Sequence, residues 1–242
     1  PVQTEKLYEI LDLIAYYFPE CEGINMDATV TSILHKSQEE LEMLARKKVK
    51  HLYLGIESGL DDVLKFMKKD HDLAQAYQAI DRLHEAGLIY DAHIMTGVAG
   101  KGRGMENAEA LAQFLNRTNP AHVVNFSMFL HKEVPLYQDI RQGTFVPADE
   151  LETIREEYHL IERIAPEKAG ANILYDGFHD FIHVRVRGHL PGDKEKMLAK
   201  LNGIIQEYEG KEPVYSFVQG ECPDLEYCDD GKAVWDMDRK TS

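Results

Sequence analysis

The sequence predicts an α/β protein whose strands form part of a (β/α) barrel. Short, mostly apolar runs typical of buried strands alternate with amphipathic stretches of helical period. This alternation implies a parallel sheet with right-handed crossovers. None of the expected strands is followed by the Gly-rich loop of a dinucleotide-binding sheet, which favours a barrel over a doubly wound fold.

The strands follow from apolar runs bounded by turn residues. The run His51 to Ile56 is the most typical of a strand buried on both faces. Together the runs predict strands over 23–31, 51–56, 91–96 and 123–130.

The helices follow from apolar residues at helical spacing and from their capping residues. Thr4 is expected to cap the first helix, which Pro19 ends. Ser37 and Glu40 form a capping box, and Gly87 suits the position after a helix. Pro147 suits the first turn of a late helix. That late helix is expected to bury Leu151, Ile154, Tyr158, Ile161 and Ile164.

The pattern changes after Ala165. Residues 181–187 alternate apolar and polar side chains, as a one-sided strand does, and Asp193 can cap a following helix. We therefore divide the chain into a partial barrel over 1–165, a C-terminal extension packed on it over 166–210, and an acidic, loosely ordered tail over 211–242.

The composition and net charge of the chain limit the classes of protein to which it can belong. The 242 residues include 44% apolar residues, enough for a core, but no apolar run long enough to cross a membrane and no export signal. The net charge of −15, from 27 basic and 42 acidic residues, argues against a sequence-independent grip on nucleic acid, although it leaves room for a small basic patch. Three cysteines fit a reducing, cytoplasmic compartment.

Function in a (β/α) barrel gathers at the carboxyl ends of the strands. Glu57 and Ser58 follow one strand, and both could accept ribose hydroxyls; alternatively, Ser58 caps a helix and Glu57 braces a loop. Gly97 begins a glycine-rich stretch that lets a ligand approach the backbone, or is a flexible loop. Asn125 and Ser127 are expected to share one strand face with Phe129 and to line a cavity, because polar groups in an apolar strand are costly unless paired.

Metal binding has little support in the sequence. Cys222 and Cys228 lie six residues apart, whereas zinc and cluster motifs use closer pairs with further ligands. The eleven histidines are scattered, so no metal site is expected.

Taken together, these stretches resemble bacterial radical S-adenosylmethionine (radical SAM) proteins of the Fe–S oxidoreductase group, relatives of oxygen-independent coproporphyrinogen III oxidase and of the Elp3-like and MiaB-like groups. The resemblance runs from about Thr4 to Leu201. It rests on the order of Leu52 to Gly59, Asp62 to Lys65, the strand end at Gly97, the turn Pro135 to Tyr137, and Gly188 to Lys194.

The resemblance implies a partial barrel that binds S-adenosylmethionine and a 4Fe-4S cluster, and that starts radical chemistry on a substrate which the sequence does not name. It assigns Glu57 and Ser58 to the cofactor's ribose or amino-acid part. It assigns the backbone of Met95, Thr96 and Gly97 to the adenine. Asn125, Ser127 and Phe129 would line the cofactor and substrate cavity.

The CxxxCxxC cluster motif and the Gly-Gly-Glu-like motif of that family do not occur in these residues, and Cys21 is alone. The chain is thus expected to be a truncated polypeptide, the product of a misplaced gene start, or a cluster-less remnant, and to bind no four-iron cluster by itself. Two alternatives remain: a non-catalytic binding or regulatory module on the same fold, and an unrelated β/α-barrel lyase or hydrolase. An uncovered first strand would favour self-association through an open sheet edge.

Overall fold

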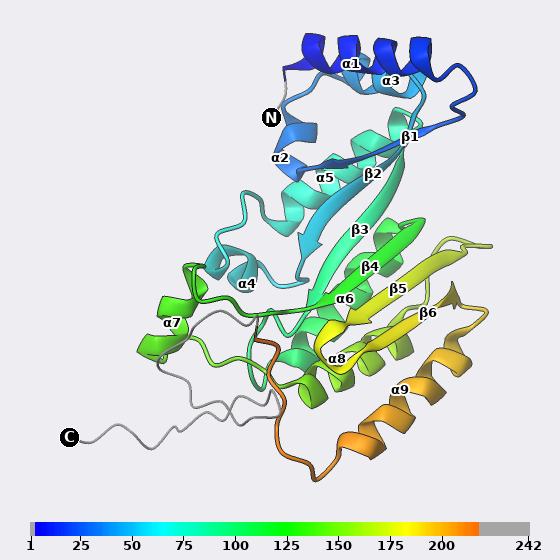
Figure 1. Ribbon diagram of the computed structural model, residues 1–242. Helices are drawn as coiled ribbons and strands as arrows, with labels where there is room; N and C mark the ends of the chain where they lie inside the picture. The colour runs from blue at the N-terminus through cyan, green and yellow to red at the C-terminus, as the bar shows by residue number, and fades with distance from the viewer. Residues whose placement is uncertain (1–2, 218–242) are drawn as a thin grey trace.

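The computed structural model describes residues 3–217 and confirms the α/β class (Figure 1). One six-stranded sheet has the order β1-β2-β3-β4-β5-β6, in which β1 to β5 are parallel and β6 is antiparallel to β5. Sequential neighbours throughout are what a barrel wall requires. The strands are β1 (Ile24–Ala28), β2 (Val49–Glu57), β3 (Ile89–Thr96), β4 (His122–Ser127), β5 (Ile173–His179) and β6 (Val184–Leu190).

The helices lie between the strands, and the main ones cover one face of the sheet (Figure 1). They are α1 (Thr4–Tyr17), α2 (Val30–Leu34), α3 (Gln38–Arg46), α4 (Asp61–Phe66), α5 (Leu73–Glu85), α6 (Gly104–Thr118), α7 (Leu136–Gln142), α8 (Glu150–Arg163) and α9 (Lys194–Tyr208). This covered face is called the helix face below, and the opposite face the concave face.

Capping residues set most helix boundaries as expected. Ser37 forms the predicted capping box, and its Oγ accepts from the Glu40 N–H at 3.2 Å. Gly87 follows α5 with a φ of +75°, a conformation that costs glycine little. The start at Pro147 is wrong, because Asp149 caps α8 by accepting from the Glu152 N–H at 2.9 Å. Thr4 is the first residue of α1 rather than its cap.

The strands between 23 and 130 were expected, but β5 was not. Its sequence, with Asp176 and Gly177 in the middle, does not stand out as a buried strand. The strand expected over 181–187 lies three residues later, because residues 180–182 form a single 3₁₀ turn that ends with His183 at a φ of +53°. β4 ends at Ser127, before the expected Leu130.

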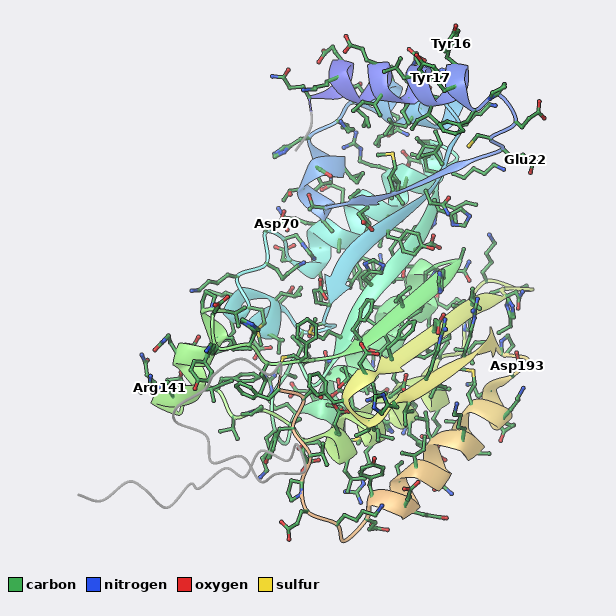
Figure 2. All side chains as sticks on the ribbon, in the orientation of Figure 1. Tyr16, Tyr17, Glu22, Asp70, Arg141 and Asp193 are labelled. Atoms are coloured by element: carbon green, nitrogen blue, oxygen red, sulfur yellow. The ribbon has the colours of Figure 1, made fainter. Side chains whose placement is uncertain are left out.

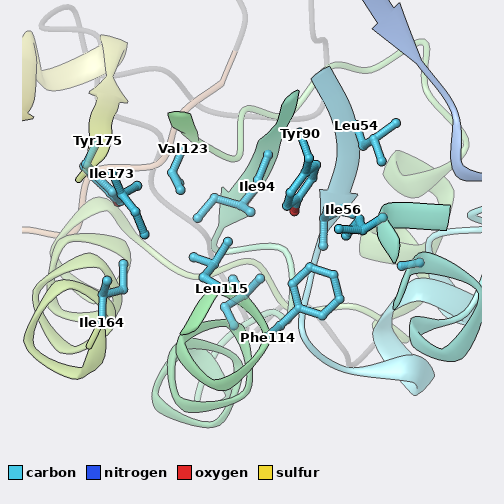
Figure 3. Close-up of a cluster of buried hydrophobic side chains, with 14 of the residues drawn as sticks. Leu54, Ile56, Tyr90, Ile94, Phe114, Leu115, Val123, Ile164, Ile173 and Tyr175 are labelled. Atoms are coloured by element: carbon cyan, nitrogen blue, oxygen red, sulfur yellow. The ribbon is translucent and has the colours of Figure 1, made fainter. Parts of the chain in front are cut away.

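The main core lies between the helix face and α5, α6 and α8 (Figure 3). Alternate residues of each strand supply it, as period-two geometry requires: Leu54 and Ile56 from β2, Ile94 from β3. Phe114 from α6 closes against them.

The carboxyl ends of the parallel strands meet at one edge of the sheet. Gly55, Gly97 and Asn125 lie at that edge, as expected, and the Asn125 side chain accepts from the Thr96 N–H at 3.1 Å. The acidic tail was expected over 211–242. Its residues from 218 onward, which include Cys222 and Cys228, lie outside the described residues. Within the described part, Phe217 is buried and forms a bridge with Leu130.

We predict that the chain self-associates through its first edge. β1 has a single sheet neighbour, β2, and α1 beside it exposes Ile10, Leu13 and Tyr17 to 42%, 55% and 69% (Figure 2). An edge strand next to an apolar surface offers both hydrogen bonds and buried area to a second copy. Light scattering should give a mass that rises with concentration, and Leu13→Glu should abolish the rise.

Glu9→Gln, a polar change on the same helix, is the control for that variant. A constant monomer mass over the whole concentration range would contradict the prediction.

Candidate functional site

Helix α8 turns an acidic face toward the sheet. The side chains of Glu150, Glu156 and Glu157 lie in residues that are 2%, 0% and 0% exposed. Carboxylates at such depth are costly unless they are paired and hydrogen-bonded. Their partners come from β3, β4 and β5 and from Asn107 of α6.

Glu156 holds two loops at the strand ends. Its Oε2 accepts from the Gly97 N–H at 2.9 Å and its Oε1 from Asn107 Nδ2 at 2.7 Å. The Asn107 Oδ1 in turn accepts from Ser58 Oγ at 2.6 Å and from the Gly59 N–H at 3.2 Å. The ends of β2 and β3 are thus fixed to α8 by one carboxylate and one amide.

Glu157 holds β4 and β5 in the same way. Its Oε1 accepts from Tyr175 OH at 2.9 Å and from Asn125 Nδ2 at 3.1 Å. Its Oε2 lies 3.0 Å from His179 Nε2, and His179 Nδ1 lies 3.0 Å from Glu150 Oε2. The imidazole therefore bridges two buried carboxylates.

Burial and pairing act in opposite directions on these groups. Burial alone would lower the pKa of His179, but the charges of Glu157 and Glu150 and the hydrogen bonds to them outweigh it and raise the pKa to about 10. Burial raises the pKa of Glu156 to about 8, against the hydrogen bonds from Asn107 and Gly97. His179 is thus a cation at neutral pH, and Glu156 is largely protonated.

This network takes up most of the polar residues predicted for the site. Ser58, Asn125 and Ser127 all lie on the helix face, where Ser127 Oγ donates to Glu150 Oε1 at 3.1 Å. The expectation that Asn125 and Ser127 line a cavity is wrong, because α8 supplies the partners they need. Their part in binding the cofactor by other contacts stays a prediction.

The main chain of Thr96 and Gly97 is also engaged within the protein. The Thr96 carbonyl accepts from the Met128 N–H at 2.9 Å, and the Gly97 carbonyl accepts from the Gly100 N–H at 3.0 Å. Phe129 lies beyond the end of β4 and is 56% exposed. It does not lie beside Asn125 and Ser127 as expected.

The concave face carries a continuous row of rings that the sequence analysis missed. Ring centroids lie 5.1 Å apart for Tyr53 and His93, 5.9 Å for His93 and Phe126, and 5.6 Å for Phe126 and Phe178, the last pair stacked. The Arg185 guanidinium lies 4.7 Å from the Phe178 centroid. This aromatic row crosses β2 to β6, and Phe126 in it is 37% exposed.

Polar pairs lie on the concave face nearer the amino ends of the strands. His51 Nδ1 lies 2.6 Å from Asp91 Oδ2, and Tyr53 OH lies 3.1 Å from His122 Nδ1. Burial raises the pKa of Asp91, although the hydrogen bond with His51 opposes the rise, and burial lowers the pKa of His122. Asp91 Oδ1 and His122 Nε2 are buried and have no partner among the described residues.

Glu57 ends β2 on the concave side with a φ of +62°, which is uncommon outside glycine. Its Oε1 accepts from Lys69 Nζ at 3.1 Å, and its side chain is 23% exposed. A Cβ on Gly55 would lie 2.7 Å from Glu57 Oε1, so glycine there makes room for the carboxylate. A usable signal for this face was present, since alternate residues along one strand are His51, Tyr53, Gly55 and Glu57.

Comparison with known proteins gives a family match over the first part of the chain and a similar fold. Residues 2–115 match the profile of the Radical SAM superfamily. A tRNA uridine(34) acetyltransferase from Methanocaldococcus infernus is 25% identical over 119 residues, which are 49% of this chain and 22% of that protein.

Two solved structures are similar. An Elp3 of Methanocaldococcus infernus with an N-terminal deletion superposes with a TM-score of 0.57 at 17% identity, over 77% of this chain and 42% of that one. Methylornithine synthase gives a TM-score of 0.49 at 15% identity, over 83% and 63%. The chain thus spans less than half the length of the acetyltransferase and of the Elp3 chain.

In the described part of the chain, no helix is both long and apolar enough to cross a membrane. Within residues 3–217, no group of three or more His, Cys, Asp or Glu side chains is arranged to hold a metal ion.

We predict that Gly97→Ala is more destabilising than Gly87→Ala. Both glycines have positive φ, +83° and +75°, so alanine is strained at either position. A Cβ at Gly97 would also lie 2.7 Å from Thr153 Cγ2, whereas Gly87 has nothing within 4 Å. Denaturant unfolding should show an excess loss of about 1–3 kcal/mol for Gly97→Ala.

Thr153→Ser removes the clashing methyl group and should recover most of that excess in the Gly97→Ala background. Equal losses for the two glycine variants would show that the close packing of Gly97 on α8 is incorrect.

We predict that stability falls as pH rises through the neutral range and that Glu156→Gln reduces the fall. The folded-state pKa of about 8 for Glu156 lies above its ordinary value of 4.5, so the folded state binds the extra proton between these values. Its contribution to stability is therefore lost as pH rises toward 8. Chemical unfolding at several pH values from 5 to 9 measures the slope.

Glu162→Gln, at a half-exposed position of the same helix, should keep the wild-type slope. If the stability of Glu156→Gln changed with pH as steeply as that of the wild type, Glu156 would be ionised over the whole pH range and the prediction would be wrong.

Proposed function

We propose that the chain is part of a radical SAM protein and forms the cofactor-facing wall of an enzyme that cleaves S-adenosylmethionine reductively to start radical chemistry. The match over residues 2–115 carries this proposal. The fold supports it, since a row of parallel strands presents an uncovered concave face with rings and titratable groups.

The concave rim fits S-adenosylmethionine in part. Lys69 engages only Oε1 of Glu57, and Oε2 accepts no other hydrogen bond from the described residues. A free carboxylate oxygen suits a ribose hydroxyl, and the half-exposed ring of Phe126 suits stacking with adenine. Three of the residues that the resemblance assigned to the cofactor site have side chains that take no part in the hydrogen bonds with α8: Glu57, Met95 and Phe129.

The described residues do not fit a four-iron cluster. They contain one cysteine, Cys21, whose thiol lies 3.4 Å from the Gly23 carbonyl oxygen, and such a cluster needs several thiolates. Cys222 and Cys228 lie outside them. No step that depends on a cluster is derived from this chain.

If bound here, S-adenosylmethionine would supply radical chemistry after accepting one electron from a donor outside the described residues, and Glu57 and Phe126 would hold it at the rim. The chain's own residues would orient the ligand. Glu57 would hold polar groups at the rim, and the aromatic row would give an apolar surface for the ligand to pack on. His51 and Asp91 can hold a proton at the far end of that surface.

A non-catalytic binding or regulatory module on the same fold is the remaining alternative. Coding sequence upstream of Pro1 with an in-frame CxxxCxxC would favour the enzyme. An unrelated lyase or hydrolase is not favoured, since the family match names another chemistry. A reducing, cytoplasmic setting and the absence of a general nucleic-acid grip remain inferences from the three cysteines and the net charge of −15.

We predict weak binding of S-adenosylmethionine to this chain at the concave rim. Two or three hydrogen bonds at about 0.5–1.5 kcal/mol each, set against the cost of immobilising the ligand, leave an affinity in about the millimolar range. Titration followed by amide chemical shifts should move the signals of Glu57, Met95 and Phe126. Glu57→Gln should weaken the effect.

Glu85→Gln, an exposed carboxylate on α5, is the matched control. Three results would each overturn the proposed site: shifts confined to the helix face, no shifts at the rim, or micromolar binding that Glu57→Gln does not weaken.

A further inference from the structure

A basic hollow lies between β6 and α9, away from the aromatic row's exposed ring. It has a volume of about 440 Å³ and is lined by Arg185, Val186, Arg187, Lys196, Met197 and Lys200. Figure 1 shows α9 running beside β6, the last strand of the sheet. Secondary structure brings the cations together, because residues two apart in a strand share a face and residues four apart in a helix share a side.

The charge of this hollow is opposite to that of the chain. Arg185, Arg187, Lys196 and Lys200 give four positive charges against the one carboxylate of Asp176, a local excess of +3, while the whole chain carries −15. Like charges four apart on a helix repel each other. The chain as a whole is rich in acidic residues, but this basic cluster has too few carboxylates to balance its charge. The unbalanced positive charge indicates that the hollow binds an anion from outside the described residues.

The four cations are unequally engaged. Asp176 binds the Arg185 fork at 2.8 and 2.6 Å, and Lys200 Nζ donates to the Arg185 carbonyl at 2.6 Å, so these two shape the wall. Arg187 Nε lies 3.6 Å from Asp176 Oδ2, beyond hydrogen-bond reach, and its side chain is 56% exposed. Lys196 is exposed and has no carboxylate partner among the described residues.

The floor of the hollow is rigid and apolar. Val186 is 0% exposed and Met197 is 2% exposed, and both belong to the main core. Arg187 from β6 and Lys196 from α9 therefore line the hollow beside a fixed surface. An arginine fork with an added lysine is the donor set that suits a phosphate group, and the volume suits a small molecule.

We propose that this hollow binds the phosphate group of a small phosphorylated molecule, with Arg187 and Lys196 as the two cations that contact it. The hollow borders the concave face, because Arg185 also packs on Phe178 of the aromatic row, but Arg187 and Lys196 take no part in the proposed S-adenosylmethionine site.

Pyrophosphate is the probe, and calorimetric titration of the full chain at low salt is the measurement. We expect saturable binding that weakens as salt is added, and a loss of about tenfold or more in affinity for Arg187→Gln and for Lys196→Gln. Lys6→Gln, an exposed cation on α1, should bind as the wild type does.

Thermal unfolding without ligand separates binding from folding. Removing Lys196 relieves repulsion with Lys200, so Lys196→Gln should keep or raise the melting temperature while it loses pyrophosphate binding. No saturable binding, or equal affinity in all four proteins, would overturn the proposal. Tight binding of a single-stranded RNA that pyrophosphate does not displace would overturn it in favour of a nucleic-acid backbone.

Discussion

The acidic face of α8 is the constraint on which the strand ends depend. Three carboxylates lie inside the protein with one histidine as their nearest cation, so each must be satisfied by the strands it faces. Glu156 fixes Gly97 and, through Asn107, Ser58. Glu157 fixes Asn125, Tyr175 and His179. Breaking one of these contacts leaves a buried group without its partner, which costs more than an ordinary hydrogen bond contributes.

This arrangement divides the polar residues of the sheet into two sets with different roles, one on the helix face and one on the concave face. On the helix face, Ser58, Asn125 and Ser127 hold loops in place through their bonds to Asn107 and the glutamates of α8. Those on the concave face include groups that are incompletely paired, such as Asp91 and His122. Polar residues in a strand therefore do not by themselves mark a ligand site, since an acidic helix can use them just as fully as a cofactor would.

Much of the fold could be predicted from interactions within a few residues of chain. The other features depend on contacts between residues that are far apart in the sequence. Ser37 and Gly87 act within a few residues of chain, so their patterns were sufficient. The strand alternation correctly placed Asn125 and Ser127 on one face, but period two cannot say which face meets the helices. Glu156 and Glu157 were missed because apolar spacing in α8 pointed to Leu151 and Tyr158, and no local rule predicts a buried carboxylate whose partners lie on other strands.

The same network explains why a ligand on the concave face would meet a fixed surface. Phe126 lies in β4 between Asn125 and Ser127, and both neighbours are tied to α8 from the opposite side of the strand. The ring therefore cannot shift along the strand without breaking bonds to Glu157 or Glu150. Phe178 is held similarly, because the next residue, His179, bridges those two carboxylates. Buried charge on one face thus gives the aromatic row on the other a precise position, as the proposed radical chemistry would require for selective attack on one atom.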